Sequence, residues 1–508
     1  MNVPYLVDDC LYHLAQHITD IDTLYNCLYV NHFMCKSVIP KLWSRALFKA
    51  KRKDLLIRTY LSCLNEEEKA SLIPFNINLS DVNQHPFLQY EKYMESCNNV
   101  VLEGAVHDWL KLTSTHRVDR KDLRIKQISR ALWIMFLSRC HNFKSFFYDI
   151  SEWSDVEFDF PEGSMTLNVK PSLSNLQVLT LCTNGGLNGS REIEGPLNFL
   201  KSIPSVCSNI QELGIYDVDS GVDNGLFSDI IKSQRSIKSL SYMGSTHSVI
   251  PSLKVHKNSL TQLVFFSSTI GSLEALTYLE CLESLDICDC IFTVNGDHIL
   301  SSIFRNLKEL SLMKNNLKPD TVAEIIKKTG HTLKRLILDV ITLETMVAAS
   351  QYIQDIVHLG VSVNFEIPPI FFFWIKKLKL ERLIFFESSI SYSNTFMRDL
   401  RMNLPPTITE LSMDFFNPTA TELSNFMDSC EAPLRSLVLR FNSKHIDLYL
   451  KVLAVIVPMM KTLKTLSFTN SPRNIIWRDA QKQYIDTIKE SGVEILTKRY
   501  EIYIRDVW

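Results

Sequence analysis

The sequence predicts an α/β solenoid with a parallel sheet on its concave side, preceded by a small all-α domain. Two observations carry this prediction. A six-residue apolar pattern recurs from the middle third of the chain onward, and the first 48 residues lack that pattern but place apolar residues at helical spacing. A chain of 508 residues also exceeds one ordinary core, so a repeat array or several domains are required.

The repeated unit is an apolar residue, two variable residues, a second apolar residue, one variable residue and a third apolar residue. The central residue is leucine in twelve copies, at positions 179, 213, 240, 263, 285, 310, 336, 359, 383, 411, 437 and 466. The mean step is about 26 residues, within the range of leucine-rich repeats. The segment Leu307–Leu317, "LKELSLMKNNL", matches the complete pattern of such a repeat.

A second pattern accompanies the leucines. Leucine-rich repeats place Asn or Cys three residues after the third apolar position, turned inward, where a polar side chain satisfies backbone groups at the bend. Nine of the twelve residues at this ladder position are Asn, Cys or Ser. The twelve are Asn184, Val218, Ser245, Ser268, Cys290, Asn315, Ile341, Asn364, Ser388, Phe416, Asn442 and Ser471.

The segments between the strands have helical spacing. Capping boxes are predicted at Thr321 with Glu324 and at Thr419 with Glu422. Strand and helix in each unit predict a leucine-rich-repeat horseshoe with a parallel concave sheet. Further strands are expected at Phe143, in "FKSFFY", and at Val493, in "VEILTK", which gives about 12–14 repeats.

The N-terminal residues predict three short amphipathic helices. Leu11, Leu14 and Ile18 share one helical face, and Thr19–Asp20 end that helix. Asp22 is expected to cap a second helix. The third helix leads to a Leu-Trp pair at residues 42–43.

This segment resembles the F-box, and fungal F-box-like proteins in particular, although Val7 stands where the family usually has proline. The resemblance implies a surface that binds a Skp-type adaptor and, through it, a cullin complex. The residues that the resemblance assigns to adaptor binding are Leu6, Asp8, Leu11, Leu14, Ile18, Leu24, Leu28, Val30 and Trp43.

The resemblance further implies the substrate-recognition subunit of an SCF-type (Skp-cullin-F-box) ubiquitin ligase. In this role the repeats hold an unknown protein substrate and other subunits perform catalysis, so the chain itself is not an enzyme. The alternatives are a leucine-rich-repeat protein-binding scaffold without a ubiquitin-ligase role and an enzyme with an unrecognised site. The predicted domains are 1–48 (F-box-like), 49–140 (helical connecting region) and 141–508 (repeats).

We expect the substrate on the concave sheet, because side chains beside the inward leucines point outward. Their mixture of acids, arginines and apolar residues is typical of a protein interface and unsuited to a phosphate backbone. The predicted substrate-binding residues are Tyr216, Met243, Phe266, Met313, Arg335, Arg382, Phe386 and Arg440.

Composition and motifs narrow the remaining function classes. The net charge of −2 gives no general attraction to nucleic acid or membrane. The basic stretch Arg117–Arg130 is interpreted as a solvated helix face rather than a docking patch. The longest apolar runs, such as Val452–Met460, are too short to span a bilayer, and no secretion signal is evident, so a cytoplasmic or nuclear location is expected.

The chemistry-bearing residues predict no metal site, cofactor or catalytic residue. The twelve cysteines form no CxxC pair, so free thiols are favoured over a metal site. Phosphate-binding loops and the common hydrolase and kinase motifs are absent from the sequence. Cys288 faces outward from its predicted strand but has no evident histidine partner, so we do not expect it to be a nucleophile.

Overall fold

The computed structural model comprises two compact units, residues 1–260 and residues 261–508. The structure describes residues 8–79, 82, 86–114, 117–140, 142–149, 170–184, 194–218, 224–293, 304–339, 341–362, 367–386, 396–413, 419–428, 430–440, 446–469 and 477–497.

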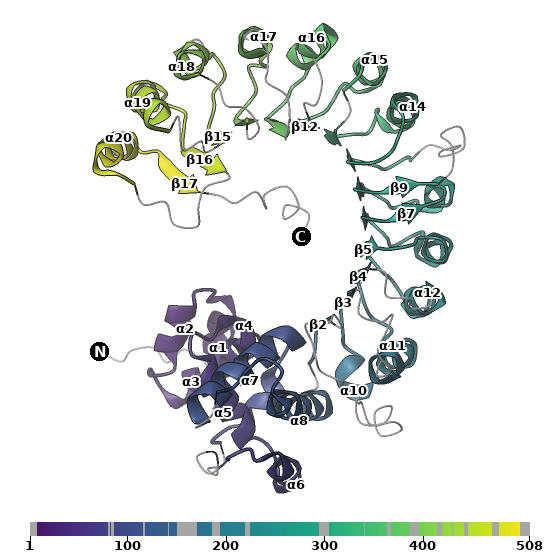
Figure 1. Cartoon of the computed structure of the whole chain (residues 1–508), viewed down its shortest axis with the longest axis vertical. Helices are drawn as coiled ribbons and strands as arrows, with labels where there is room; N and C mark the ends of the chain where they lie inside the picture. The colour runs from purple at the N-terminus through teal and green to yellow at the C-terminus, as the bar shows by residue number, and fades with distance from the viewer. Residues whose placement is uncertain are drawn as a thin grey trace. The chain divides into compact units, whose positions relative to one another are not determined.

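The first unit begins with helices, as Figure 1 shows. They are α1 (Asp8–His17), α2 (Ile21–Cys27), α3 (His32–Trp43), α4 (Ala46–Lys49), α5 (Lys53–Ser62), α6 (Glu66–Ala70), the 3-10 helices η1 (Ile73–Phe75) and η3 (Tyr90–Tyr93), α7 (Asn99–Thr113) and α8 (Leu123–Arg139).

Parallel strands follow in the same unit, with helices between most of them. The strands are β1 (Ser96–Asn98), β2 (Ser145–Asp149), β3 (Val178–Asn184), β4 (Glu212–Val218) and β5 (Ser239–Met243). The helices that accompany β3–β5 are α10 (Lys170–Leu173), α11 (Glu194–Val206), α12 (Asn224–Ser233), α13 (Val249–Ser252) and η5 (Leu253–His256).

In the second unit, the long sheet contains ten parallel strands among the described residues, and they are neighbours in the order of the chain. They are β6 (Gln262–Phe266), β8 (Ser284–Cys288), β10 (Glu309–Met313), β11 (Arg335–Leu338), β12 (His358–Ser362), β13 (Arg382–Phe386), β14 (Glu410–Met413), β15 (Ser436–Arg440), β16 (Thr465–Thr469) and β17 (Glu494–Thr497). Two shorter strands, β7 (Thr269–Ile270) and β9 (Ile291–Phe292), follow β6 and β8 in the sequence and pair with each other in a separate small sheet.

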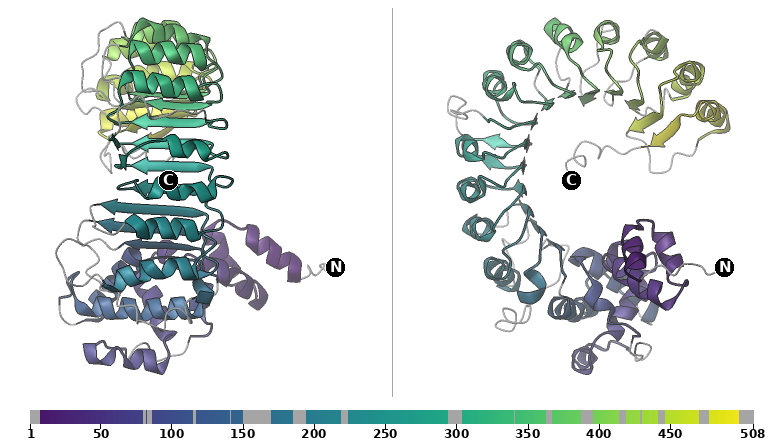
Figure 2. Two further views of the ribbon diagram at one scale, coloured as in Figure 1. Left: turned by 90° about the vertical axis from the view of Figure 1, so that its right-hand side faces the viewer. Right: turned by 180° about the vertical axis from the view of Figure 1, so that it is seen from behind.

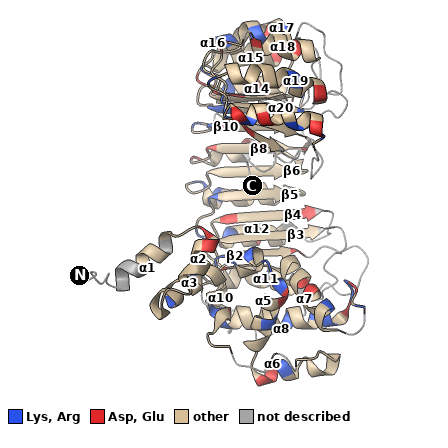
Figure 3. Cartoon of the chain, turned by 90° about the vertical axis from the view of Figure 1, so that its left-hand side faces the viewer, with Lys and Arg blue, Asp and Glu red and all other residues tan. Residues whose placement is uncertain are grey.

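Helices cover the outer side of the second unit, and the strands line its inner side (Figures 1 and 2). These helices are η6 (Glu274–Tyr278), α14 (Pro319–Thr329), α15 (Leu343–Tyr352), α16 (Pro369–Lys377), α17 (Phe396–Asn403), α18 (Ala420–Asp428), α19 (Ile446–Ile456), η8 (Val457–Met459) and α20 (Asp479–Glu490). Acidic and basic positions lie side by side along α20, as Figure 3 shows.

The register explains why the leucine pattern gives this fold. Leu310 pairs with Leu285 on one side and with Leu336 on the other, and this alignment of central leucines recurs between the later strands. Each repeat places its leucines against those of the neighbouring repeats, where they are almost completely buried. The fold is therefore an α/β solenoid of the leucine-rich-repeat type, as predicted.

Twelve strands lie where the leucine pattern predicts them, and the strands expected near Phe143 and Val493 are β2 and β17. Strand β1 was not predicted, and it pairs with β2 from within the range assigned to the helical connecting region. The division into 1–48, 49–140 and 141–508 stays a prediction.

Two helix starts differ from the sequence prediction. Asp20, not Asp22, caps α2. Helix α14 begins at Pro319, so Thr321 lies buried inside the first turn and forms no capping box. Proline fits this first position because its missing N–H would have no partner there. The capping box at Thr419 is confirmed, with Thr419 N donating to Glu422 Oε2 at 2.7 Å and Glu422 N donating to Thr419 Oγ1 at 3.1 Å.

The inward ladder is confirmed after three strands of the second unit. Ser268, Cys290 and Asn315 follow β6, β8 and β10 and bond to backbone groups, the first two being buried. Ser245 is instead exposed. The side chains of Asn184 and Val218 are outside the described part, as are the residues Asn364, Ser388, Phe416, Asn442 and Ser471.

Candidate functional sites

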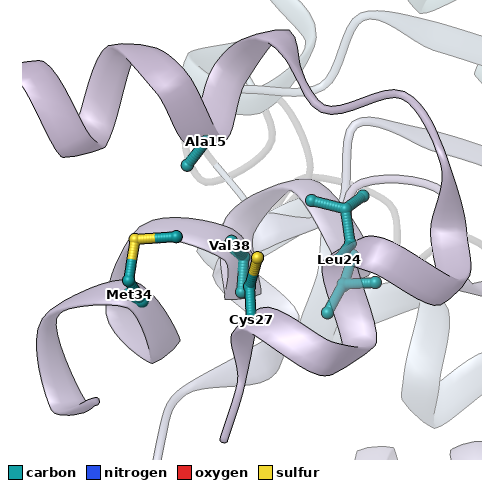
Figure 4. Close-up of a cluster of buried hydrophobic side chains, with 6 residues drawn as sticks. Ala15, Leu24, Cys27, Met34 and Val38 are labelled. Atoms are coloured by element: carbon teal, nitrogen blue, oxygen red, sulfur yellow. The ribbon is translucent and has the colours of Figure 1, made fainter. Parts of the chain in front are cut away.

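The three N-terminal helices share a small core of their own (Figure 4). Its buried members are Ala15, Leu24, Cys27, Met34, Val38 and Leu42, and Ile18, Leu28 and Trp43 pack against it from partly buried positions. These residues come from α1, α2 and α3, so the core fixes the three helices relative to one another. We call α1–α3 the helical module.

Polar caps at the chain bends let such short helices form. Thr23 N donates to the Asp20 carboxylate at 2.7 Å at the start of α2. Met34 N donates to Asn31 Oδ1 at 2.8 Å at the start of α3. Each cap satisfies a backbone N–H that has no partner within its helix.

The structure divides the predicted adaptor-binding residues into two groups. Leu24 belongs to the core and is completely buried, whereas Leu14 and Val30 are 53% and 64% exposed. Ile18, Leu28 and Trp43 lie between these extremes. Asp8 and Leu11 lie on α1 with side chains outside the described part, and Leu6 precedes the described residues.

Two exposed tyrosines enlarge the apolar surface of the module. Tyr25 on α2 is 50% exposed, and Tyr29, directly after that helix, is 88% exposed. Sequence reasoning missed them, although Tyr25 lies between the inward residues Leu24 and Cys27 and Tyr29 follows Leu28, so neither shares the buried face. Such exposed aromatic residues are typical of protein interfaces.

A cavity of about 350 Å³ lies next to these tyrosines. Its walls come from the helical module and from α4, α5 and η3. The lining residues are Ile21, Tyr25, Leu28, Tyr29, Cys35, Ile39, Leu42, Trp43, Ala46, Lys49, Ala50, Leu56 and Tyr90. Two predicted adaptor-binding residues, Leu28 and Trp43, are therefore part of one largely apolar hollow.

Trp43 also joins the helical module to the region that follows it. The indole packs on Tyr90 with ring centres 4.2 Å apart and meets the edge of Tyr60 at 5.4 Å. The Ser44 carbonyl accepts hydrogen bonds from Glu95 N at 2.9 Å and Ser96 N at 3.2 Å. The module is consequently packed against the start of the sheet rather than held by a linker.

The predicted substrate-binding residues lie at outward positions of their strands. Tyr216 and Met243 are on β4 and β5 of the first unit, and both are partly buried. Burial raises the pKa of the Tyr216 phenol well above its usual range. In the second unit, Phe266, Met313, Arg335, Arg382 and Arg440 are partly buried and Phe386 is buried.

A row of charged residues crosses the second unit beside the central leucines. Arg335 Nη1 lies 3.3 Å from Glu309 Oε2, and Arg382 Nε lies 3.1 Å from Glu410 Oε2. The register places His358 between the two arginines. Sequence reasoning missed His358, although "IVHLGV" puts it in the same outward position as Arg335 in "LKRLIL".

The described residues offer little for chemistry or metal binding. Burial and the nearby Asp286 raise the pKa of the Cys288 thiol to about 12, so at neutral pH it is protonated and a poor nucleophile. The described residues contain no group of three or more His, Cys, Asp or Glu side chains arranged to hold a metal ion. Within the described part of the chain, each helix is too short or too polar to cross a membrane.

Comparison with known proteins identifies no family for this chain. Neither a family profile nor a curated protein matches its sequence. One solved structure that it resembles is the crystal structure of a Rad7 and Elc1 complex in yeast, at 14% identity and a TM-score of 0.39, covering 85% of this chain and 92% of the matched chain. At that TM-score the similarity indicates nothing about function, and both candidate sites are inferred from the residues of this chain alone.

Proposed function

We propose that this chain is the substrate-recognition subunit of an SCF-type ubiquitin ligase. The helical module binds a Skp-type adaptor, which holds the chain to a cullin complex, and the repeats hold a target protein. The other subunits perform catalysis. This chain contributes proximity, because tethering raises the effective concentration of the target at the site of ubiquitin transfer.

One observation supports this proposal most. The helical module buries a core of its own and still exposes Leu14, Tyr25, Tyr29 and Val30. A module that served only to end the solenoid would gain stability by covering these side chains or replacing them with polar residues. The exposed side chains therefore fit a partner surface, and the resemblance of residues 1–48 to the F-box supports a Skp-type adaptor as that partner.

The test is binding of purified Skp-type adaptor to the full chain by isothermal titration calorimetry. Leu14→Glu with Val30→Glu changes two exposed side chains and leaves the module core intact. We expect a loss of at least tenfold in affinity, because the truncation of anchor residues costs about 2 kcal/mol or more. Leu343→Glu on α15, where the leucine is 58% exposed, is the matched control and should bind normally.

The same experiment separates the alternatives. If wild-type chain does not bind the adaptor, the ligase role is refuted and a protein-binding scaffold without that role becomes the favoured alternative. If the double variant binds as tightly as wild type, Leu14 and Val30 do not contact the adaptor. Circular dichroism melting of each variant establishes that the solenoid remains folded.

A further inference from the structure

The second unit carries a charge pattern that is symmetric about His358. The register aligns Glu309, Arg335, His358, Arg382 and Glu410 on five successive strands, β10 to β14. Each arginine forms an ion pair with the glutamate on its outer side. From β10 to β14, the five residues are therefore acidic, basic, histidine, basic and acidic. We call these five residues the charged row.

Uncharged residues border the charged row on both sides. Glu309 pairs in register with Ser284 on β8, and Glu410 pairs with Ser436 on β15. The pattern thus extends over five strands and then stops. Since neighbouring strands are about 4.8 Å apart, the two arginines are separated by roughly 10 Å and the two glutamates by roughly 19 Å.

His358 leaves the centre of the row uncharged at neutral pH. Burial and the positive charges of Arg382 and Arg335 lower the pKa of the imidazole, and the more weakly acting Glu381 and Glu410 oppose this shift. The two guanidinium groups therefore flank a neutral ring. An incoming carboxylate group meets positive charge on either side of His358.

An apolar floor lies directly beside the charged row. At the next outward position, Ile337, Gly360 and Ile384 are in register on β11, β12 and β13. The ring of Phe386 lies over Gly360, where a Cβ atom would be only 2.7 Å from the ring carbon Cζ. Phe386 is only 5% exposed, so the accessible part of this floor is formed by Ile337 and Ile384, which are partly buried.

We propose that the charged row and its apolar floor bind an extended segment of a target protein with two central acidic residues, an apolar residue between them and an outer basic residue on each side. This inference rests on the proposed function, in which the repeats hold a target. In the polyproline II form of an extended chain each residue advances about 3.1 Å and every third residue returns to the same face, so the acids stand about three residues apart and the basic residues about six.

Charge complementarity favours such a segment over nucleic acid. A phosphate backbone presents uniform negative charge and would meet Glu309 and Glu410 at the ends of the row. A segment with acidic residues at its centre and basic residues at its ends matches all four charges. The apolar residue between the acids lies over Ile337 and Ile384, the partly exposed residues of the floor.

Two peptides of identical composition test this inference. The first, Lys-Ala-Glu-Leu-Ala-Glu-Lys, carries the proposed pattern, and the second, Glu-Ala-Lys-Leu-Ala-Lys-Glu, inverts it. Both have blocked ends and a fluorescent label, and their binding to the full chain is measured by fluorescence anisotropy at low ionic strength. We expect the first peptide to bind at least tenfold more tightly.

Variants then assign the preference to the two arginines. Arg335→Gln with Arg382→Gln should weaken it, because only Glu309 and Glu410 then still distinguish the two peptides, and Arg335→Glu with Arg382→Glu should remove it. Lys308→Gln with Lys334→Gln is the matched control, because these lysines directly precede β10 and β11, pair with Glu283 and Asp355, and their substitution removes the same amount of charge. The control should keep the preference.

Several outcomes would overturn the inference: no binding of the first peptide, equal binding of both peptides, or a preference that the glutamine substitutions leave undiminished. Adaptor binding is measured on the same preparations. Adaptor binding without peptide preference would refute this inference alone, and peptide preference without adaptor binding would refute the proposed ligase role alone.

Discussion

Asn315 connects two neighbouring repeats through their backbones. Its Oδ1 accepts from Cys290 N at 2.9 Å, and its Nδ2 donates to the Ile287 carbonyl at 2.8 Å. A leucine has the same approximate size but can form neither bond. The residue therefore acts on the stability of the bend that follows the strand.

We predict that Asn315→Leu lowers the free energy of unfolding by roughly 1–3 kcal/mol, the usual cost of buried polar groups left without partners. Thermal melting of the full chain measures the change. Asn425→Leu, at an exposed position on α18, is the matched control and should change little. Equal melting temperatures for Asn315→Leu and wild type would show that the two bonds contribute nothing.

His256 performs a related task near the outer helices of the first unit. It is 1% exposed; Ile237 N donates to its Nδ1 at 3.4 Å, and its Nε2 lies 2.8 Å from the Ile231 carbonyl. Only the neutral ring with a proton on Nε2 can form both bonds. Gln234 does the same one repeat earlier, accepting from Ile210 N and donating to the Ile230 carbonyl.

The pKa of His256 predicts a pH-dependent stability. Burial lowers this pKa from its ordinary value of 6.5, although the bond to Ile231 opposes the shift. The unfolded chain therefore binds a proton at a higher pH than the folded chain. Stability is lost as the pH falls below 6.5, by at most about 1.4 kcal/mol per pH unit, until the pKa of the folded state is reached.

Denaturant unfolding between pH 7.5 and pH 5 measures this effect. His256→Gln keeps one acceptor and one donor, in the manner of Gln234, and removes the titrating group. The variant should lose less stability than wild type over this range. Parallel pH profiles for the two chains would show that His256 is not the group responsible.

The ring of Phe386 on β13 packs on Gly360 of β12, which has no side chain to obstruct it. A Cβ on Gly360 would meet Phe386 at 2.7 Å and Ile337 at 3.2 Å. We predict that Gly360→Ala costs about 1–3 kcal/mol, because a filled surface must shift to accept a methyl group. Gly104→Ala is the control, since nothing lies within 4 Å of its added methyl group and alanine favours its helix.

A double-mutant cycle assigns the cost to the aromatic ring. Combining Gly360→Ala with Phe386→Leu should cost less than the sum of the two single changes, as expected for residues in contact. Strict additivity in thermal melts would contradict the proposed packing of Phe386 on Gly360.

The strands were predictable from sequence because twelve central leucines share one period. Strand β1 was not, because "SCN" contains no apolar repeat and becomes a strand through its pairing with β2. The capping box at Thr419 was predictable and the one at Thr321 was wrong, because Pro319 starts that helix two residues earlier. Local signals thus predict elements, whereas neighbours decide where some of them begin.

The candidate sites were predictable only in part for a similar reason. The F-box resemblance selects the residues of the helical module but does not distinguish the buried Leu24 from the exposed Leu14. The outward positions of the strands follow from alternation, but the pairing of Arg335 with Glu309 across two repeats depends on register. The structure shows that Glu309 and Arg335 are in register on neighbouring strands and form an ion pair.

At the scale of the whole chain, the helical module is part of a larger packed region. Trp43 packs on Tyr60 and Tyr90, and the Ser44 carbonyl accepts from two backbone N–H groups at the start of β1. We predict that deletion of residues 1–48 destabilises the remaining chain, because both tyrosines lose their contact with Trp43 and both N–H groups lose their acceptor. Scanning calorimetry and size-exclusion chromatography test this.

A truncated chain with the melting temperature of the full chain would contradict that packing. The prediction also governs how function is tested. If a truncated chain loses a binding partner, the cause can be either the missing interface or the lower stability of the chain. Point substitutions at exposed residues of the full chain separate these two causes, because they leave the packing intact.

The most direct test of the central claim is quantitative affinity purification with mass spectrometry on three full-length chains: wild type, Leu14→Glu with Val30→Glu, and Arg335→Gln with Arg382→Gln. The account predicts that the first pair of substitutions removes the Skp-type adaptor and cullin but keeps the remaining partner proteins. The arginine substitutions should have the opposite effect. Equal recovery of adaptor and cullin with all three chains, or their absence from the wild-type sample, would contradict the account.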